Sequence, residues 1–213
     1  MKIGLLEALL LISIITSDGI SHVARPRSIS KPKAGYDMDT NMFSPDGSLH
    51  QVKYAVKSVL QGSLTIGIVC KDGVVLIAYD HKPRSLLLVK ECLKKIVLYE
   101  SNVLGAFSGL QADGRLLATQ TRFFLANHER LFNESSSLES LANHLSDVYL
   151  LFNDYPSPEN QERKMHARPL GVGSLLAGKD HMGFSLFYLD PSGNQGRWRA
   201  KAMGKDSHSI DEK

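Results

Sequence analysis

The chain has 213 residues, 43% of them hydrophobic, and a formal net charge of +3. This composition suits one globular domain with a substantial core. The mild charge, without a concentrated basic stripe, argues against a nucleic-acid-binding protein. Cys70 and Cys92 are the two cysteines, too few for a disulfide framework. The eight histidines show no zinc-ligand spacing, so we expect no metal site.

Residues 1–34 differ in character from the rest of the chain. Lys2 precedes an apolar run, residues 3–15, interrupted only by Glu7, and residues 22–34 are rich in Arg, Lys, Ser and Pro. The pattern resembles a secretory signal peptide and is too short to span a membrane. We interpret 1–34 as an N-terminal extension and linker. It is a targeting peptide, a lineage-specific extension or an incorrectly assigned gene start.

A turn leading into an amphipathic helix is predicted next. Pro45 presets its own φ angle, and Asp46-Gly47 completes a reverse turn. Ser48 is the expected N-cap, with Gln51 closing a capping box. Gly62 is the expected helix end. Apolar residues recur between them at helical spacing: Leu49, Val52, Val56, Val59 and Leu60.

Strands and then helices follow along the chain. Residues 63–70 and 74–79 read as a hairpin, and 96–99 with 103–108 as a second strand pair. Residues 113–130 carry apolar side chains at helical spacing. A second helix is expected after a capping box formed by Ser136 and Glu139, with apolar residues at Leu138, Leu141, Leu145, Val148 and Phe152.

The final third is again rich in predicted strands. Residues 170–177 and 184–189 are expected to flank a turn at 178–183. Residues 196–202 alternate as a single half-buried strand, with Trp198, Ala200 and Ala202 on its apolar face. The tail 205–213 is polar and is predicted to be disordered. The order of strands, helices and strands predicts an α+β domain in which two sheets stack with helices outside.

Several short segments stand out along the chain, in this order: Tyr36-Asp37, 43–47, 51–55, Lys95-Ile96, 108–113, 168–172, 190–193 and 202–204. Together they resemble the proteasome alpha subunits. The resemblance runs from residue 35 to residue 204, and the runs 127–135 and 138–140 are most similar to the type-five member of the alpha family. It implies a four-layer αββα sandwich of the amino-terminal nucleophile hydrolase type. Two helices that usually follow in this family are missing, which leaves an assembly-incompetent, truncated fragment as one alternative.

The same resemblance raises the question of catalysis. Hydrolases of this fold use a Thr, Ser or Cys at the first position of the mature chain, where the free amine assists the nucleophile. The corresponding residue is Ser63, which follows a predicted helix and therefore has an amide nitrogen in place of an amine. We expect no catalytic residue and no cofactor. The enzyme alternative is a hydrolase that cleaves itself before Ser63.

The resemblance also implies a role in a ring. Alpha subunits form seven-membered rings whose amino-terminal segments gate an axial channel, and the gate-forming positions correspond to Tyr36, Asp37, Pro45 and Tyr54. Each of these residues, taken alone, is also typical of an ordinary turn or packing position. The implied partners are neighbouring alpha subunits, the beta ring and a regulatory cap. The implied setting is ubiquitin-dependent protein degradation in cytoplasm and nucleus, with no membrane or nucleic-acid partner.

A second implied site would receive the carboxyl terminus of a regulatory activator. Lys95 corresponds to the pocket lysine of the family, and Gly62 and Leu110 would line the same pocket. A lysine in a cleft is a suitable carboxylate receptor. The alternative is a solvated lysine beside Lys94 and Lys90.

Overall fold

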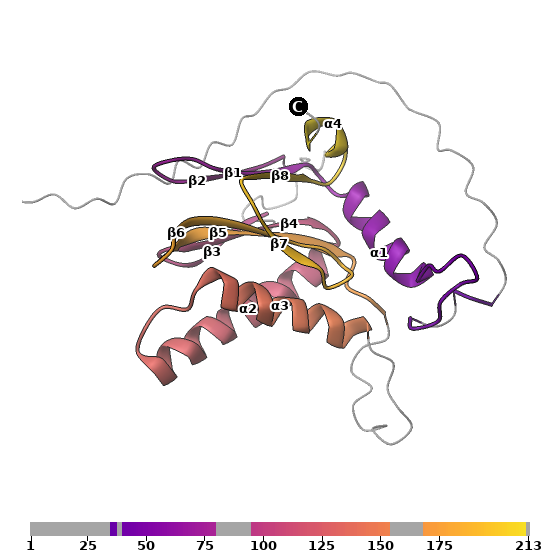
Figure 1. The fold of residues 1–213 in the computed structure, drawn as a ribbon, viewed down its shortest axis with the longest axis horizontal. Helices are drawn as coiled ribbons and strands as arrows, with labels where there is room; N and C mark the ends of the chain where they lie inside the picture. The colour runs from indigo at the N-terminus through magenta and orange to yellow at the C-terminus, as the bar shows by residue number, and fades with distance from the viewer. Residues whose placement is uncertain (1–34, 38–39, 80–94, 154–167, 212–213) are drawn as a thin grey trace, which may run out of the picture.

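The structure is a computed structural model that describes residues 35–37, 40–79, 95–153 and 168–211. The predicted N-terminal extension, residues 1–34, lies outside this part of the chain. The helices and strands of the described part are shown in Figure 1 and follow in this order: α1 (His50–Gln61), β1 (Thr65–Val69), β2 (Val74–Ala78), β3 (Ile96–Glu100), β4 (Val103–Gly109), α2 (Gln111–Phe132), α3 (Leu138–Asn153), β5 (Val172–Asp180), β6 (Gly183–Leu189), β7 (Gln195–Trp198), β8 (Ala200–Met203) and α4 (His208–Asp211).

The strands form two antiparallel sheets. The smaller has the order β2-β1-β8 and the larger the order β3-β4-β5-β6-β7. The sheets face each other (Figure 1), with contacts between β1 and β6 and between β2 and β5. Both predicted hairpins are confirmed by the pairing of β1 with β2 and of β3 with β4. The core between the sheets consists of apolar side chains from both: Val74, Leu76, Leu104, Ala106, Leu175, Ala177, Leu186 and Met203.

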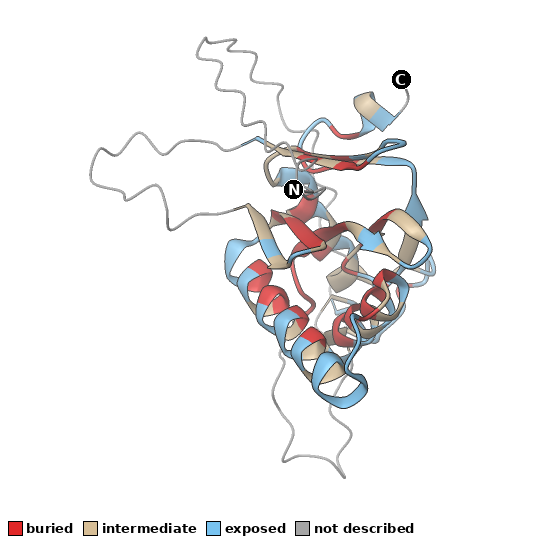
Figure 2. Ribbon diagram, turned by 90° about the vertical axis from the view of Figure 1, so that its left-hand side faces the viewer, coloured by how far each residue is buried: buried red, intermediate tan, exposed pale blue. Residues whose placement is uncertain are grey.

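Helices α2 and α3 cover the other face of the larger sheet. Figure 2 shows their buried residues on the side turned toward that sheet and their exposed residues on the outer side. Tyr149 of α3 is fully buried there, and its hydroxyl donates a hydrogen bond to the carbonyl of Val172 at 2.9 Å. A polar atom in an apolar core needs such a partner. The α+β class predicted from the order of elements is therefore confirmed.

Helix α1 begins later than predicted. Its N-cap is Leu49, with no side-chain capping bond, so the expected capping box of Ser48 and Gln51 is wrong. Ser48 instead belongs to the preceding turn, where its N–H donates to the hydroxyl of Ser44 at 3.2 Å. A bridge between Phe43 and Leu49 holds Ser48 in that turn. The hydroxyl of Ser48 accepts from Lys53 at 2.6 Å and does not cap the helix.

The cap of α3 differs from the predicted one by one residue. Ser137, not Ser136, accepts the N–H of Ser140 at 3.1 Å. The N–H of Leu138 is satisfied by the carboxylate of Asp180, at 3.2 Å, from the end of β5. A carboxylate at a helix N-terminus also interacts favourably with the helix dipole. The sequence pattern could not show this partner, because Asp180 lies 42 positions away.

The predicted strand 196–202 is two strands in different sheets. β7 ends at Trp198 in the larger sheet, Arg199 follows, and β8 begins at Ala200 in the smaller sheet. Trp198 is 46% exposed, so the prediction that Trp198, Ala200 and Ala202 share one apolar strand face is wrong. The predicted turn at 178–183 is likewise too long, because β5 continues to Asp180 and pairs there with Gly183.

The tail is ordered over the described residues 205–211. The short helix α4 lies beside β8, on the side of the smaller sheet that faces away from the larger one (Figure 1). Asp211 accepts the backbone N–H of Ala202 at 2.9 Å and forms an ion pair with Lys201. The prediction of disorder was wrong here because a charged side chain satisfies the otherwise free edge of β8.

Candidate functional site

The turn before α1 has the predicted geometry. The N–H of Gly47 donates to the carbonyl of Ser44 at 2.8 Å and closes a reverse turn with Pro45 and Asp46 in its centre. Gly47 has a φ of 71°, a conformation that L side chains adopt with strain. Ser44 is buried beneath the turn, whereas Pro45 is exposed. The turn is thus rigid and presents Pro45 to the outside.

The segment before the turn is attached to α1. The side-chain nitrogen of Gln51 donates a hydrogen bond to the backbone carbonyl of Asp37. Tyr36 is 37% exposed and Tyr54 is 46% exposed. The ring of Tyr54 stacks on that of His50, with centroids 6.3 Å apart. The predicted gate residues are therefore gathered around the first turns of α1, with both tyrosines open to solvent.

The three residues predicted to form the activator pocket each lie next to β4. The carbonyl of Lys95 accepts the N–H of Phe107 at 3.2 Å. A Cβ atom on Gly62 would lie 2.3 Å from the backbone nitrogen of Gly109, which is followed by Leu110, 44% exposed. Gly62 and Leu110 thus lie beside Gly109 at the end of β4, and Lys95 lies beside Phe107, two residues earlier in the same strand.

Ser63 lies between α1 and β1, in the interior of the chain. Its carbonyl accepts a hydrogen bond from the hydroxyl of Ser108 at 2.9 Å, and the same hydroxyl lies 3.2 Å from the carbonyl of Val59. The nitrogen of Ser63 is an amide joined to Gly62, which in turn is packed against Ser108. An amide has no lone pair available as a base, so this arrangement does not activate the serine.

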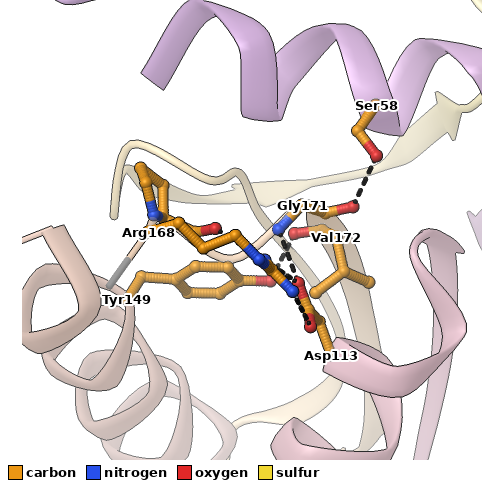
Figure 3. Close-up of polar contacts among 7 residues, drawn as sticks. Ser58, Asp113, Tyr149, Arg168, Gly171 and Val172 are labelled. Carbon is orange, nitrogen blue, oxygen red and sulfur yellow. Dashed lines mark hydrogen bonds and ion pairs between the residues drawn. The ribbon is translucent and has the colours of Figure 1, made fainter. Parts of the chain in front are cut away.

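Sequence reasoning did not anticipate a polar cluster at the start of α2, drawn in Figure 3. Arg168 donates from both terminal nitrogens to Asp113, at 2.7 and 2.9 Å. Asp113 also accepts the N–H of Gly171 at 2.9 Å. The carbonyl of Gly171 in turn accepts the hydroxyl of Ser58 in α1 at 3.1 Å. We call this cluster of Ser58, Asp113, Arg168 and Gly171 the clamp.

The clamp joins helices α1 and α2 to the segment that leads into β5. The carboxylate of Asp113 is largely buried, which raises its pKa, but the hydrogen bonds from Arg168 and Gly171 outweigh this effect and hold the pKa below its ordinary value. Two segments quoted for the family resemblance, 108–113 and 168–172, are therefore direct partners. No local sequence pattern indicates which of their residues pair.

An open groove of about 570 Å³ lies between the segment before α1 and the end of α3. Its lining includes Thr40, Leu49, Val52, Leu150 and Leu151. The sequence-predicted site residues lie elsewhere. Within the described residues, no group of His, Cys, Asp and Glu could hold a metal ion, and no helix is long and apolar enough to cross a membrane.

Comparison with known proteins gives the same family along nearly all of the described chain. Residues 36–57 match the N-terminal signature of the A-type proteasome subunits, and residues 59–212 match the proteasome subunit family. The chain belongs to the proteasome alpha subunits. By family it is therefore a non-catalytic component of the 20S core.

Individual relatives show how similar it is to other members of the family. It is 37% identical over 178 residues to the proteasome alpha type-5 subunit of Dictyostelium discoideum, covering 84% of this chain and 71% of that protein. It is 38% identical over 178 residues to the alpha type-5 protein of Drosophila melanogaster, covering 84% and 72%. A probable alpha type-3 protein of Schizosaccharomyces pombe is 36% identical over 176 residues, covering 82% and 67%.

Proposed function

We propose that this chain is a type-five-like alpha subunit that builds the outer ring of the 20S core and helps to gate its channel. The observation that carries the proposal is the hydrogen bond from Gln51 to the carbonyl of Asp37. This bond fixes the segment that contains Tyr36 and Asp37 to α1, so a movement of α1 would move that segment too. Through this ring the chain would contribute to ubiquitin-dependent degradation in cytoplasm and nucleus.

Gate closure in a ring requires contacts between neighbouring copies of this segment. The exposed phenol rings of Tyr36 and Tyr54 can pack against a neighbour and still form hydrogen bonds through their hydroxyls. Pro45 restricts the backbone of the turn, so the turn can hold the segment around Tyr36 and Asp37 in one position at little entropic cost. Asp37 is suited to accept a hydrogen bond from a neighbour's tyrosine.

The clamp supports the same role from within the folded chain. Ser58 connects the last turn of α1 to Gly171, and Gly171 is bound to the Asp113–Arg168 pair. Helix α1 is thereby held against the larger sheet, where Gly62 and Lys95 each have a backbone neighbour in β4. We infer that a carboxyl terminus of a regulatory cap would bind at this end, with Lys95 as the cation, and would act on the gate through α1.

A partner ring would fit on the outer side of α2 and α3. The two helices carry large apolar side chains that are more than half exposed, of which the last two also line the groove: Phe123, Leu131, Phe132, Leu150 and Leu151. Such side chains on a helical surface favour burial against another protein, for which the beta ring is the family's candidate. We assign the sandwich to the αββα type of the amino-terminal nucleophile hydrolases, since two facing sheets and one helical layer correspond to three of its four layers.

The gating proposal is tested in core particles that contain this chain. Tyr36→Ala and Asp37→Ala should raise the hydrolysis of a short fluorogenic peptide severalfold without an activator, and should leave the rate with saturating activator unchanged. Met182→Ala, at a 69% exposed position between β5 and β6, is the matched control. Unchanged basal hydrolysis in particles that contain the variants would contradict gating.

Two further measurements separate the alternatives. Intact mass after expression distinguishes a non-catalytic ring component from a self-processing hydrolase, because cleavage before Ser63 would remove all of α1. Migration on a native gel distinguishes an assembled chain from an assembly-incompetent fragment. Migration of the tagged chain with the core particle excludes the fragment, and migration only as a free chain excludes ring membership.

A further inference from the structure

Helices α2 and α3 lie side by side over the larger sheet (Figures 1 and 2) and meet along a row of aromatic rings. The rings of Phe124 in α2 and His144 in α3 are stacked, with centroids 4.4 Å apart and an angle of 18° between their planes. The row continues along α2, where His128 stacks on Phe124 at 6.1 Å and lies against Phe132 at 4.7 Å. The ring of His144 is therefore part of the contact that joins the two helices.

One ring nitrogen of His144 has no hydrogen-bond partner within the described residues. This nitrogen, Nε2, is buried. A neutral imidazole carries a single N–H, so the buried nitrogen can be the one that holds a lone pair. A protonated imidazole carries an N–H on both nitrogens. The buried Nε2–H would then lack an acceptor among the described residues, which is unfavourable.

The surroundings of His144 oppose a positive charge on its ring. Burial lowers the pKa of His144, and Asp147, one turn further along α3, raises it by less, so the pKa lies below its ordinary value. The face of Phe124 would attract a positive ring. This attraction is weaker than the loss from a buried, charged N–H that has no acceptor. The folded chain therefore favours the neutral ring.

The elements packed against α3 bring no second carboxylate to His144 in the part of the chain that the structure describes. From α2, the titratable group in the row of rings is His128, whose own partner is Glu134 at 4.0 Å. β5 and β6 meet α3 through an apolar core. β7 places a cation, Arg197, on the face that meets α3, since Gln195, two residues earlier, bonds to that helix.

We propose that His144 is a proton switch in the helical layer. While its ring is neutral, α3 stays packed on α2 through the stack of His144 on Phe124. When Nε2 takes up a proton from the solvent, the new N–H turns toward water and the two helices separate at this contact. The switch belongs to the folded chain, and its action does not depend on the place of that chain in a ring.

The pH dependence of stability tests the switch. A lowered folded-state pKa leaves stability full above the unfolded pKa of about 6.5 and reduces it as the pH falls through the folded pKa. From about pH 6.5 to pH 5.5 the ratio of unfolded to folded chain should rise severalfold more in the wild type than in His144→Phe, with about tenfold as the limit for one proton. His181→Gln, at an exposed position between β5 and β6, is the control and should follow the wild type. Parallel curves for the wild type and His144→Phe would overturn the proposal.

A second measurement needs no variant. In an NMR titration of the wild-type chain, the ring of His144 should take up its proton below about pH 6.5, the value for an unperturbed histidine. Its resonance is the one missing from the spectrum of His144→Gln. Titration at or above the unperturbed value would show that the fold accepts the charged ring, and would overturn the proposal.

Two matched cysteines test where the chain opens. Val148, one turn after His144, is 7% exposed, and Val74, between the two sheets, is 5% exposed. Each is replaced by cysteine in a chain that carries Cys70→Ser and Cys92→Ser, and is treated with an aromatic disulfide that reacts with thiols in mild acid. At pH 5.5, Val148→Cys should react at least fivefold faster than the same variant combined with His144→Phe.

The reaction of Val74→Cys should be similar with and without His144→Phe, and at pH 7.5 neither position should respond to that substitution. An equal increase at both positions in acid would show that the whole chain unfolds and that the helices do not separate by themselves. That result, or no increase at Val148→Cys, would overturn the proposal.

Discussion

Asp113 and Arg168 lie 55 positions apart in the chain and form a two-point ion pair, with both nitrogen-to-oxygen distances below 3 Å. The pair fixes the first turn of α2 to the segment that precedes β5. The N–H of Gly171 donates to the same carboxylate, and the carbonyl of Gly171 accepts a hydrogen bond from Ser58 in α1. The clamp thus links α1, to which the proposed gate segment is attached, to the larger sheet, and it can be tested by substitution.

Asp113→Asn should destabilise the folded chain by about 1 to 3 kcal/mol, because the charge that pairs with Arg168 is lost while the shape is kept. Urea denaturation measures the change as a lower midpoint. Arg168→Lys keeps the charge but loses the two-point geometry, so a smaller loss is expected. Since the Arg168 side chain is 53% exposed, water can replace part of its contribution. An unchanged midpoint for Asp113→Asn would show that the pair adds nothing to stability.

The contribution of Asp113 should depend on pH. Burial raises the pKa of its carboxyl, but hydrogen bonds from Arg168 and Gly171 bring the pKa below the ordinary value. A carboxyl with a lowered folded-state pKa stabilises the fold above its unfolded pKa, about 4, and this stability is lost as the pH falls through the folded pKa. The difference in urea midpoint between wild type and Asp113→Asn should therefore be full at pH 7 and shrink below about pH 4. A difference that stays constant to acid pH would exclude this linkage.

Gly62→Ala should lower the stability of the folded chain for a purely steric reason. The backbone φ of Gly62 is −65°, which alanine adopts freely. Its Cβ atom, however, would lie 2.3 Å from the nitrogen of Gly109, and overpacking against backbone costs about 1 to 3 kcal/mol. Gly196→Ala is the matched control, since its new Cβ would meet only the side chain of Trp198, at 3.2 Å. We expect the control to change stability by about 0.5 kcal/mol or less. Equal midpoints in thermal unfolding would contradict the close approach at Gly62.

Ser137→Ala should cost about 1 kcal/mol, because it removes the hydroxyl that caps α3. Ser136→Ala should cost less, although Ser136 was the cap expected from sequence, because its hydroxyl donates to the carbonyl of Ser137 and not to the helix. Chemical denaturation of the two variants under the same conditions compares them. A larger loss of stability for Ser136→Ala than for Ser137→Ala would show that Ser136 is the cap of α3, as predicted from the sequence.

Much of the local structure could be read from the residues themselves. Strand-forming runs between turn residues placed β1 to β6 close to their observed bounds, and apolar residues at helical spacing placed α1, α2 and α3. Pro45 and Gly47 form the expected turn because their φ preferences act within a few residues. The family also followed from short motifs, since their order along the chain is a property of the sequence alone.

Long-range contacts set the remaining features. Arg199 looks like the centre of one continuous strand, yet β7 and β8 belong to different sheets because each pairs with a different neighbour. Ser48 does not cap α1, because its backbone N–H is bound to Ser44 within the preceding turn. Helix α4 is ordered because Asp211 accepts a hydrogen bond from the free edge of β8. The clamp joins residues whose individual surroundings in the sequence are ordinary. Short-range preferences thus determine where elements form, while pairing across the folded chain determines which sheet, cap or carboxylate each of them meets.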